Sequence, residues 1–213
     1  AALLACLAVL PAARAGAYQW PDAGMGQRTS ERVSAGKRAA KYIACTVCEE
    51  RVAALFPSDA DADQIGRVVE AEIGDHLGDA KTLCAMKPLA RLFRGRRLEV
   101  SPKPDGSAEL RATKKHPLYE EINTSELAFH WKSLAVQHAC METFRKDGDA
   151  VAAAFGKAYA ALAEAADEAG DAKQPGGALA PVWAAAQSAC RKARMCRAAA
   201  KLNGEAAPRG AEL

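Results

Sequence analysis

The spacing of six cysteines constrains the fold of this chain more than any other feature of its sequence. They form a close pair, two single residues and a second close pair, each within or beside a segment in which apolar residues recur at helical spacing. In order they are Cys45, Cys48, Cys84, Cys140, Cys190 and Cys196. Three nested disulfides that clamp a helical bundle would need this order. The pattern therefore predicts an all-α, disulfide-stapled fold.

Six cysteines allow many pairings, and their order alone selects none of them. Cys45 and Cys48 are three residues apart, so they share one face of a helix. If the first and last helices pack antiparallel, the earlier cysteine of one pair faces the later cysteine of the other. That geometry would give the disulfides Cys45–Cys196, Cys48–Cys190 and Cys84–Cys140.

The cysteines have two alternative chemical interpretations. Cys45-Thr46-Val47-Cys48 has the spacing of a redox-active pair, but no strand of a thioredoxin-like unit precedes it. A zinc site would need both close pairs to converge as tetrahedral ligands, and the spacing of Cys190 and Cys196 is not that of a zinc-binding pair. Structural disulfides fit the spacing best.

Residues 1–17 have the pattern of a secretory signal peptide. The apolar run Ala1 to Leu10 is too short to span a bilayer, and Ala15-Gly16-Ala17 resembles a cleavage site. A buried helix is the alternative, which the proline and small residues at the end of the run disfavour. Cleavage would remove Cys6 and leave an even number of cysteines, as an oxidising compartment favours. Because no later segment is apolar for long enough to cross a membrane, we expect a luminal or secreted protein.

Composition shifts divide the rest of the chain into three parts. They predict a flexible arm over 18–34, a helical domain over 35–203 and a flexible tail over 204–213. Within the domain, two segments of alternating polarity flank Pro104-Asp105-Gly106, which predicts a small β-hairpin insert over 96–112.

Local signals also predict where helices begin and end. Asp59, Asp61 and Asp63 favour a helix N-terminus by capping, and the apolar stripe that follows is expected to end near Pro88. Gly148 and Asp149 predict a kink or a division in a long helix. Pro181 fits the first turn of a final helix that carries Cys190.

The charge balance argues against a nucleic-acid partner. The chain carries 29 Lys plus Arg against 26 Asp plus Glu, a mild excess that gives no basis for phosphate-backbone binding. Its clustered basic residues could contact anionic lipid headgroups or acidic protein surfaces, although solvated faces are the commoner explanation. These clusters are Arg91, Arg94, Arg96 and Arg97; Lys114 and Lys115; and Arg191, Lys192, Arg194, Arg197 and Lys201.

Other candidate sites are weak, and we expect no catalytic residue, metal or cofactor. Asp59, Asp61, Asp63 and Glu70 fall on positions of a calcium-binding loop, but Gln64 stands where that loop needs glycine. The histidines are scattered, and no nucleophile elbow or phosphate-binding loop occurs. The four histidines are His76, His116, His130 and His138.

The cysteine order resembles that of the saposin-like fold, the saposin B-type domain. The long interval between Cys84 and Cys140, with its predicted hairpin, is similar to the canopy family of secretory-pathway proteins, as is Ala139-Cys140-Met141-Glu142 ahead of a long amphipathic helix. The resemblance covers roughly residues 41–201. It implies the nested disulfide pairing given above and a role in binding client proteins during their maturation in the endoplasmic reticulum.

These observations favour a non-enzymatic, chaperone-like protein that acts by binding clients of the secretory pathway. The alternative is a saposin-like protein that opens its helices to bind lipid or to lie on a membrane. A thiol-disulfide oxidoreductase based on Cys45 and Cys48 is a more distant alternative. Only the last two residues of Gly210-Ala211-Glu212-Leu213 match the usual retrieval signal, which leaves both luminal retention and secretion open.

Overall fold

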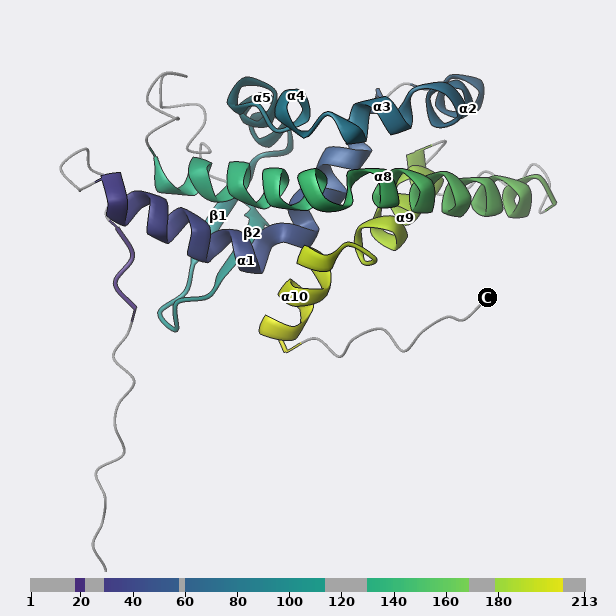
Figure 1. Cartoon of the computed structure of the whole chain (residues 1–213). Helices are drawn as coiled ribbons and strands as arrows, with labels where there is room; N and C mark the ends of the chain where they lie inside the picture. Colours follow the sequence, from purple (N-terminus) through teal and green to yellow (C-terminus); the bar gives the residue numbers. More distant parts are fainter. Residues whose placement is uncertain (1–17, 22–28, 58–59, 114–129, 169–178, 205–213) are drawn as a thin grey trace, which may run out of the picture.

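A bundle of helices with one β-hairpin makes up the structure, as the sequence predicts. The computed structural model describes residues 18–21, 29–57, 60–113, 130–168 and 179–204. At its centre, α8 (Trp131–Glu168) packs against α1 (Thr29–Ala53) and α9 (Leu179–Cys190) (Figure 1). The predicted signal peptide at 1–17 and residues 205–213 of the predicted tail lie outside the described residues.

Small side chains let α1 approach α8 closely. A Cβ on Gly36 would lie 3.0 Å from the Cβ of Leu134, so a larger residue there would push the helices apart. The helix begins at Thr29 rather than at Ala35, and residues 29–34 of the predicted arm are therefore helical. Glu31 in the first turn favours this earlier start, because its charge complements the positive end of the helix dipole.

The first residues of the predicted arm are held against the hairpin and α8. The backbone N–H of Tyr18 donates to the Pro104 carbonyl at 2.8 Å, and Trp20 Nε1 donates to the Lys103 carbonyl at 2.8 Å. Trp131 Nε1 in turn donates to the Pro21 carbonyl at 3.0 Å, and the rings of Trp20 and Trp131 stack with centroids 4.9 Å apart. Residues 18–21 thus form part of the folded body.

The predicted stripe after Pro57 is divided into separate helices. The first is α2 (Ala62–Ala71), and the carboxylate of Asp61 caps it by accepting from the Gln64 N–H at 2.7 Å, as the sequence predicts. The next is α3 (Ile73–Gly78). Asp79 caps the short α4 (Ala80–Leu83) by accepting from the Thr82 N–H at 3.2 Å. Local capping by aspartate therefore starts new helices along one apolar stripe.

The stripe ends with α4, shortly before Pro88, but Pro88 does not itself end a helix. It stands in the first turn of α5 (Met86–Arg96), where the missing N–H of proline costs nothing because the N-terminal turn has no partner for it. The helix ends at Arg97, which adopts a left-handed conformation with φ of 53°.

The hairpin is present where it is predicted. Strand β1 (Leu98–Pro102) pairs antiparallel with β2 (Ala108–Ala112), with Val100 opposite Leu110. Gly106 in the turn has φ of 82°, a conformation that favours glycine, and its carbonyl accepts from Arg38 Nε at 2.8 Å. The hairpin also packs on α1, so the insert is attached to the bundle along its length.

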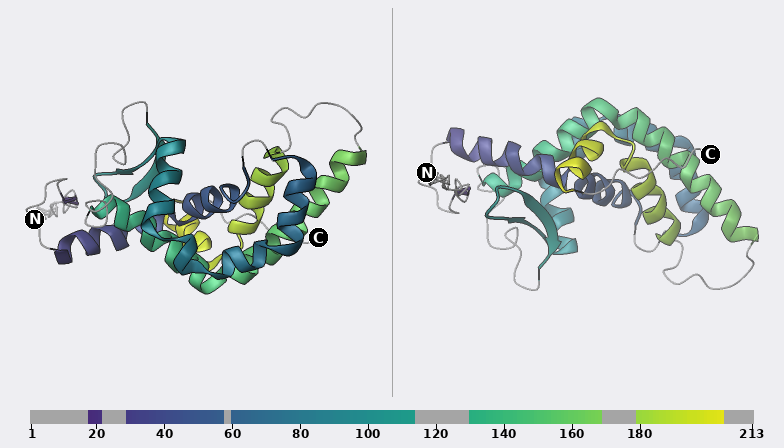
Figure 2. Two further views of the ribbon diagram at one scale, coloured as in Figure 1. Left: turned by 90° about the horizontal axis from the view of Figure 1, so that it is seen from above. Right: turned by 90° about the horizontal axis from the view of Figure 1, so that it is seen from below.

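Helix α8 is not divided at Gly148, so of the two alternatives that the sequence predicts there, a kink or a division, the division is wrong. Figure 2 shows that it bends along its length around the rest of the bundle. A Cβ at Gly148 would lie 2.3 Å from the Leu77 carbonyl oxygen of α3. Glycine is needed there because the backbones of two helices meet, and not because the helix is interrupted.

The C-terminal part contains a break that the sequence interpretation did not include. Pro181 lies in the first turn of α9, as predicted, but the chain turns after Cys190 and starts a separate helix, α10 (Arg194–Leu202). This last helix packs against α1 and α8. Among the described residues, no helix is long and apolar enough to cross a membrane.

Candidate functional site

Two disulfides lie inside the bundle. Cys48–Cys190 joins α1 to α9 with its Cα atoms 5.9 Å apart. Cys84–Cys140 joins the end of α4 to α8 with its Cα atoms 5.6 Å apart. All four sulfurs belong to fully buried residues. These bonds are two of the three pairings expected from the sequence, and they hold helices that are distant in the chain at fixed positions.

The third expected disulfide, Cys45–Cys196, is absent, because both residues are thiols in this structure. Their side chains nevertheless meet, since a side-chain hydrogen bond with Cys45 stabilises the protonated Cys196 thiol. This contact and the burial of Cys196 raise the pKa of its thiol above the ordinary value. The expected bond between Cys45 and Cys196 is therefore wrong for this structure, but the expected proximity of the two side chains is present. Cys48 is bonded to Cys190, so the close pair on α1 holds one thiol and one bridged sulfur.

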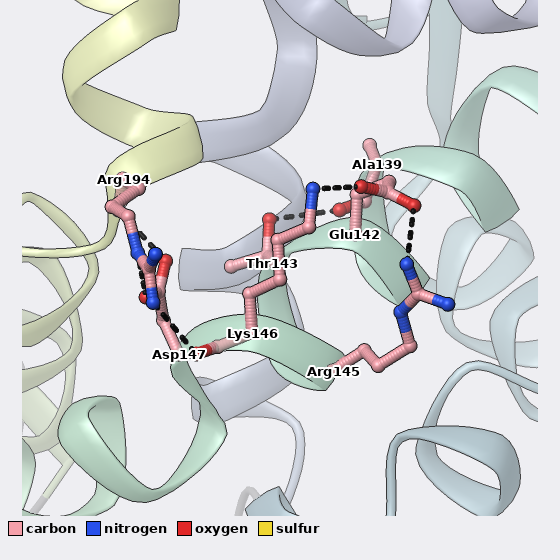
Figure 3. Close-up of polar contacts among 7 residues, drawn as sticks. All are labelled: Ala139, Glu142, Thr143, Arg145, Lys146, Asp147 and Arg194. Atoms are coloured by element: carbon pink, nitrogen blue, oxygen red, sulfur yellow. Dashed lines mark hydrogen bonds and ion pairs between the residues drawn. The ribbon is translucent and has the colours of Figure 1, made fainter.

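Asp147 of α8 fixes the start of α10. Its carboxylate accepts from the backbone N–H of Arg194 at 2.8 Å and from Arg194 Nε at 2.9 Å (Figure 3). Arg194 Nη2 also approaches the Lys146 carbonyl at 3.4 Å. Because Ala193 makes no capping bond with its side chain, Asp147 supplies the N-cap of α10 from another helix.

The neighbouring turn of α8 has its own ion pairs. Glu142 accepts from Lys146 Nζ at 2.5 Å and lies 3.4 Å from Arg145 Nη2 (Figure 3). The hydrogen bond from Lys146 is the main cause that lowers the pKa of Glu142. The hydroxyl of Thr143 donates a hydrogen bond to the Ala139 carbonyl at 2.8 Å. The basic side chains of this part of α8 are therefore already paired with a carboxylate.

The outward side of α10 carries basic groups without such partners. Residues 179–204 contain five basic residues and no acidic residue. Of the five, Arg194 is bound to Asp147, and the other four are exposed and form no ion pair among the described residues. Leu202, 51% exposed, lies on the same helix and is the one large apolar side chain that is exposed in the described part of the chain. We call this surface the α10 cationic face; its basic members are Arg197 and Lys201 on α10, with Arg191 and Lys192 in the turn before the helix.

The other basic cluster, on α5, is partly engaged within the fold. Arg96 lies 3.6 Å from Glu50 of α1 and its guanidinium covers the Trp183 ring at 5.0 Å from the centroid. Burial raises the pKa of Glu50, and the charge of Arg96 opposes that rise. Arg96 therefore helps to hold α5 against α1 and α9. Lys114 and Lys115 lie outside the described residues.

The described histidines do not form a site together. His130 is buried at the start of α8, and its Nδ1 accepts from the Lys132 N–H at 3.2 Å. Burial, with a smaller contribution from the charge of Lys132, lowers the pKa of His130 to about 4. His76 instead pairs with Glu72 on the surface, and His138 lies on another turn of α8. Among the described residues no three His, Cys, Asp or Glu side chains are grouped as metal ligands would be.

A depression of about 720 Å³ lies beside the N-terminal arm. It is open, and aromatic and polar side chains line it without any buried charged group directed into it. The sequence interpretation did not anticipate this depression, because it depends on residues 18–21 folding back onto the body. Its lining residues are Tyr18, Gln19, Trp20, Pro21, Ser30, Glu31 and Ser34.

Taken together, the fold and these surfaces define a mostly helical bundle, stapled by disulfides and carrying a small hairpin. No protein-family model, no curated protein and no solved structure matches this chain. Its architecture alone defines the class of this protein.

Proposed function

We propose that this protein is a non-enzymatic binding protein of the secretory pathway that holds client proteins during their maturation. Its cysteine order and hairpin insert resemble those of the saposin-like fold and of the canopy family, for which such a role is expected. The two disulfides are typical of an oxidising compartment, either the endoplasmic reticulum lumen or the cell exterior. Binding would occur on the outside of a rigid body.

The observation that carries this proposal is that the bundle is closed. Taking up a lipid between the helices requires their apolar faces to separate. Cys48–Cys190 ties α1 to α9, and α8 packs against both of these helices. The interface is filled by buried small residues that leave little space, among them Ala39, Ala44, Ala135, Ala139, Ala185 and Ala186. A closed bundle favours a protein that binds through its surface.

A lipid-binding function is the second candidate, because the α10 cationic face could contact anionic headgroups. It would then act at the membrane surface without opening of the helices. The sparse apolar exposure of the described surface disfavours insertion into a bilayer.

The two functions can be separated with the purified protein. A reduced, denatured secretory protein that aggregates on dilution serves as the model client, and light scattering reports its aggregation. We expect a stoichiometric amount of the protein to suppress the scattering, and we expect little sedimentation with anionic vesicles at neutral or acidic pH. The double variant Cys48→Ser with Cys190→Ser, which removes the clamp, is expected to be the weaker suppressor. Strong vesicle association with no effect on aggregation would refute the proposed function.

A further inference from the structure

We propose that the α10 cationic face is the surface that holds an acidic segment of the client polypeptide. This inference rests on the proposed function and assigns it to a particular place. Four exposed basic side chains without carboxylate partners are concentrated at one corner of a chain whose overall charge is nearly balanced. Electrostatic complementarity of this kind selects acidic partners and raises their rate of association.

The spacing on α10 suits a polypeptide ligand. Arg197 and Lys201 are separated by four residues, so their side chains project from neighbouring turns on one side of the helix, with Cβ atoms roughly 6 Å apart. Carboxylates spaced by one helical turn on a partner helix have the same separation. Leu202 and Ala198 are exposed to one side of these basic residues, and they offer a small apolar contact there.

The face is also held rigid before any partner binds. Asp147 fixes the first turn of α10 through Arg194, and Asn203 Nδ2 donates to the Tyr42 carbonyl of α1 at 3.3 Å at its other end. Cys196, 1% exposed, anchors the inner side of the helix beside Cys45. A preorganised helix loses little conformational freedom on binding, which favours affinity.

A membrane is a poorer fit to this face than a polypeptide. Amphipathic helices that lie on bilayers bury an apolar side among the acyl chains and keep basic residues at the headgroups. On α10 the apolar side, which includes Cys196 and Ala199, is buried against the bundle, so the basic side alone faces outward. Leu202 by itself offers little area for insertion.

The test uses a labelled helical peptide with glutamate at every fourth position and the same peptide with glutamine in its place. Fluorescence anisotropy should show binding of the glutamate peptide to the parent protein, little binding of the glutamine peptide, and loss of binding at about 1 M salt, where the screening length is about 3 Å. The variant Arg197→Glu with Lys201→Glu should weaken glutamate-peptide binding about tenfold or more, because two attractions become repulsions.

The matched control is Lys87→Glu with Arg91→Glu on α5. These two residues are also exposed and four residues apart, so the control makes the same change in net charge on another surface. We expect less than about a twofold change in peptide binding for it, as for other distant surface charges. An equal loss in both double variants would overturn the proposal, because it would mean that net charge alone governs binding. So would vesicles of anionic lipid that bind through Arg197 and Lys201 while the glutamate peptide does not.

The same variants separate this inference from the function on which it rests. If the α10 double variant still suppresses client aggregation as the parent does, the proposed function stands and the assignment to α10 is wrong. If the parent protein itself fails to suppress aggregation, the proposed function is wrong, whatever the peptide does.

Discussion

Replacing Gly148 by alanine tests the close approach of α8 to α3. In an exposed helix interior, Gly→Ala stabilises by about 1 kcal/mol through helix propensity. At Gly148 the new Cβ would lie 2.3 Å from the Leu77 carbonyl oxygen and 3.2 Å from the Leu77 carbonyl carbon. These are backbone atoms of α3, so the clash cannot be relieved by a side-chain rotation. Overpacking of this kind costs about 1–3 kcal/mol. We therefore expect Gly148→Ala to lower the free energy of unfolding by up to about 2 kcal/mol in total.

Gly66 of α2 supplies the control for the same substitution. A Cβ there would meet nothing within 4 Å, so Gly66→Ala should keep the propensity gain and stabilise the protein by up to about 1 kcal/mol. Urea unfolding followed by circular dichroism, with the disulfides intact, measures both variants, and a shift of midpoint at constant slope reports a change in stability. If Gly148→Ala stabilises the protein as Gly66→Ala does, the close approach of α8 to α3 is not what fixes glycine at this position.

Three further predictions concern other contacts. The variant Asp147→Ala removes the acceptor that caps the Arg194 N–H at the start of α10, so it should destabilise the protein by about 1–2 kcal/mol. Hydrogen–deuterium exchange should show faster amide exchange in α10. Unchanged protection in α10 would contradict the capping role. The buried His130 has its pKa lowered to about 4, so the unfolded chain takes up a proton below its ordinary value near 6.5 before the folded protein does. The free energy of unfolding should therefore decrease as the pH falls from about 6.5 to about 4, by up to roughly 3 kcal/mol. The variant His130→Gln should flatten that part of the curve of stability against pH. An identical curve for the variant would count against the burial of this ring. The contact between Cys45 and Cys196 predicts that a mild oxidant joins these two residues, which peptide mapping by mass spectrometry would detect; a bond from Cys45 to any other cysteine would disprove it.

Much of the architecture could be predicted because it depends on local signals or on the cysteines. The pairs Cys48–Cys190 and Cys84–Cys140 were expected on the condition that the first and last helices pack antiparallel, and both bonds are present. The hairpin followed from alternating polarity around a turn that needs the positive φ of Gly106. The hairpin depends on a short local pattern, and the disulfides depend on the positions of one residue type.

What could not be predicted depends on contacts between residues that are far apart in the chain. The start of α10 is fixed by Asp147, forty-seven residues before Arg194, so no local pattern marks it. A glycine at position 148 suggests a break in the helix when only the sequence is considered. The reason for glycine there is the Leu77 carbonyl of another helix, which leaves no room for a Cβ. The α10 cationic face is a similar case. Its residues were visible as a basic cluster, but whether they had carboxylate partners became clear only from the structure.

The wide span of Cys48–Cys190 has a consequence for the biosynthesis of this chain. The two residues are separated by 142 positions, and the Cys84–Cys140 bond lies within that interval. During translation Cys48 is present as a reactive thiol, together with Cys45 and Cys84, long before the ribosome reaches Cys190. The smaller ring can close first, whereas the outer one must wait for nearly the whole chain. Any earlier bond between Cys48 and Cys45 or Cys84 would have to be exchanged before the outer disulfide forms.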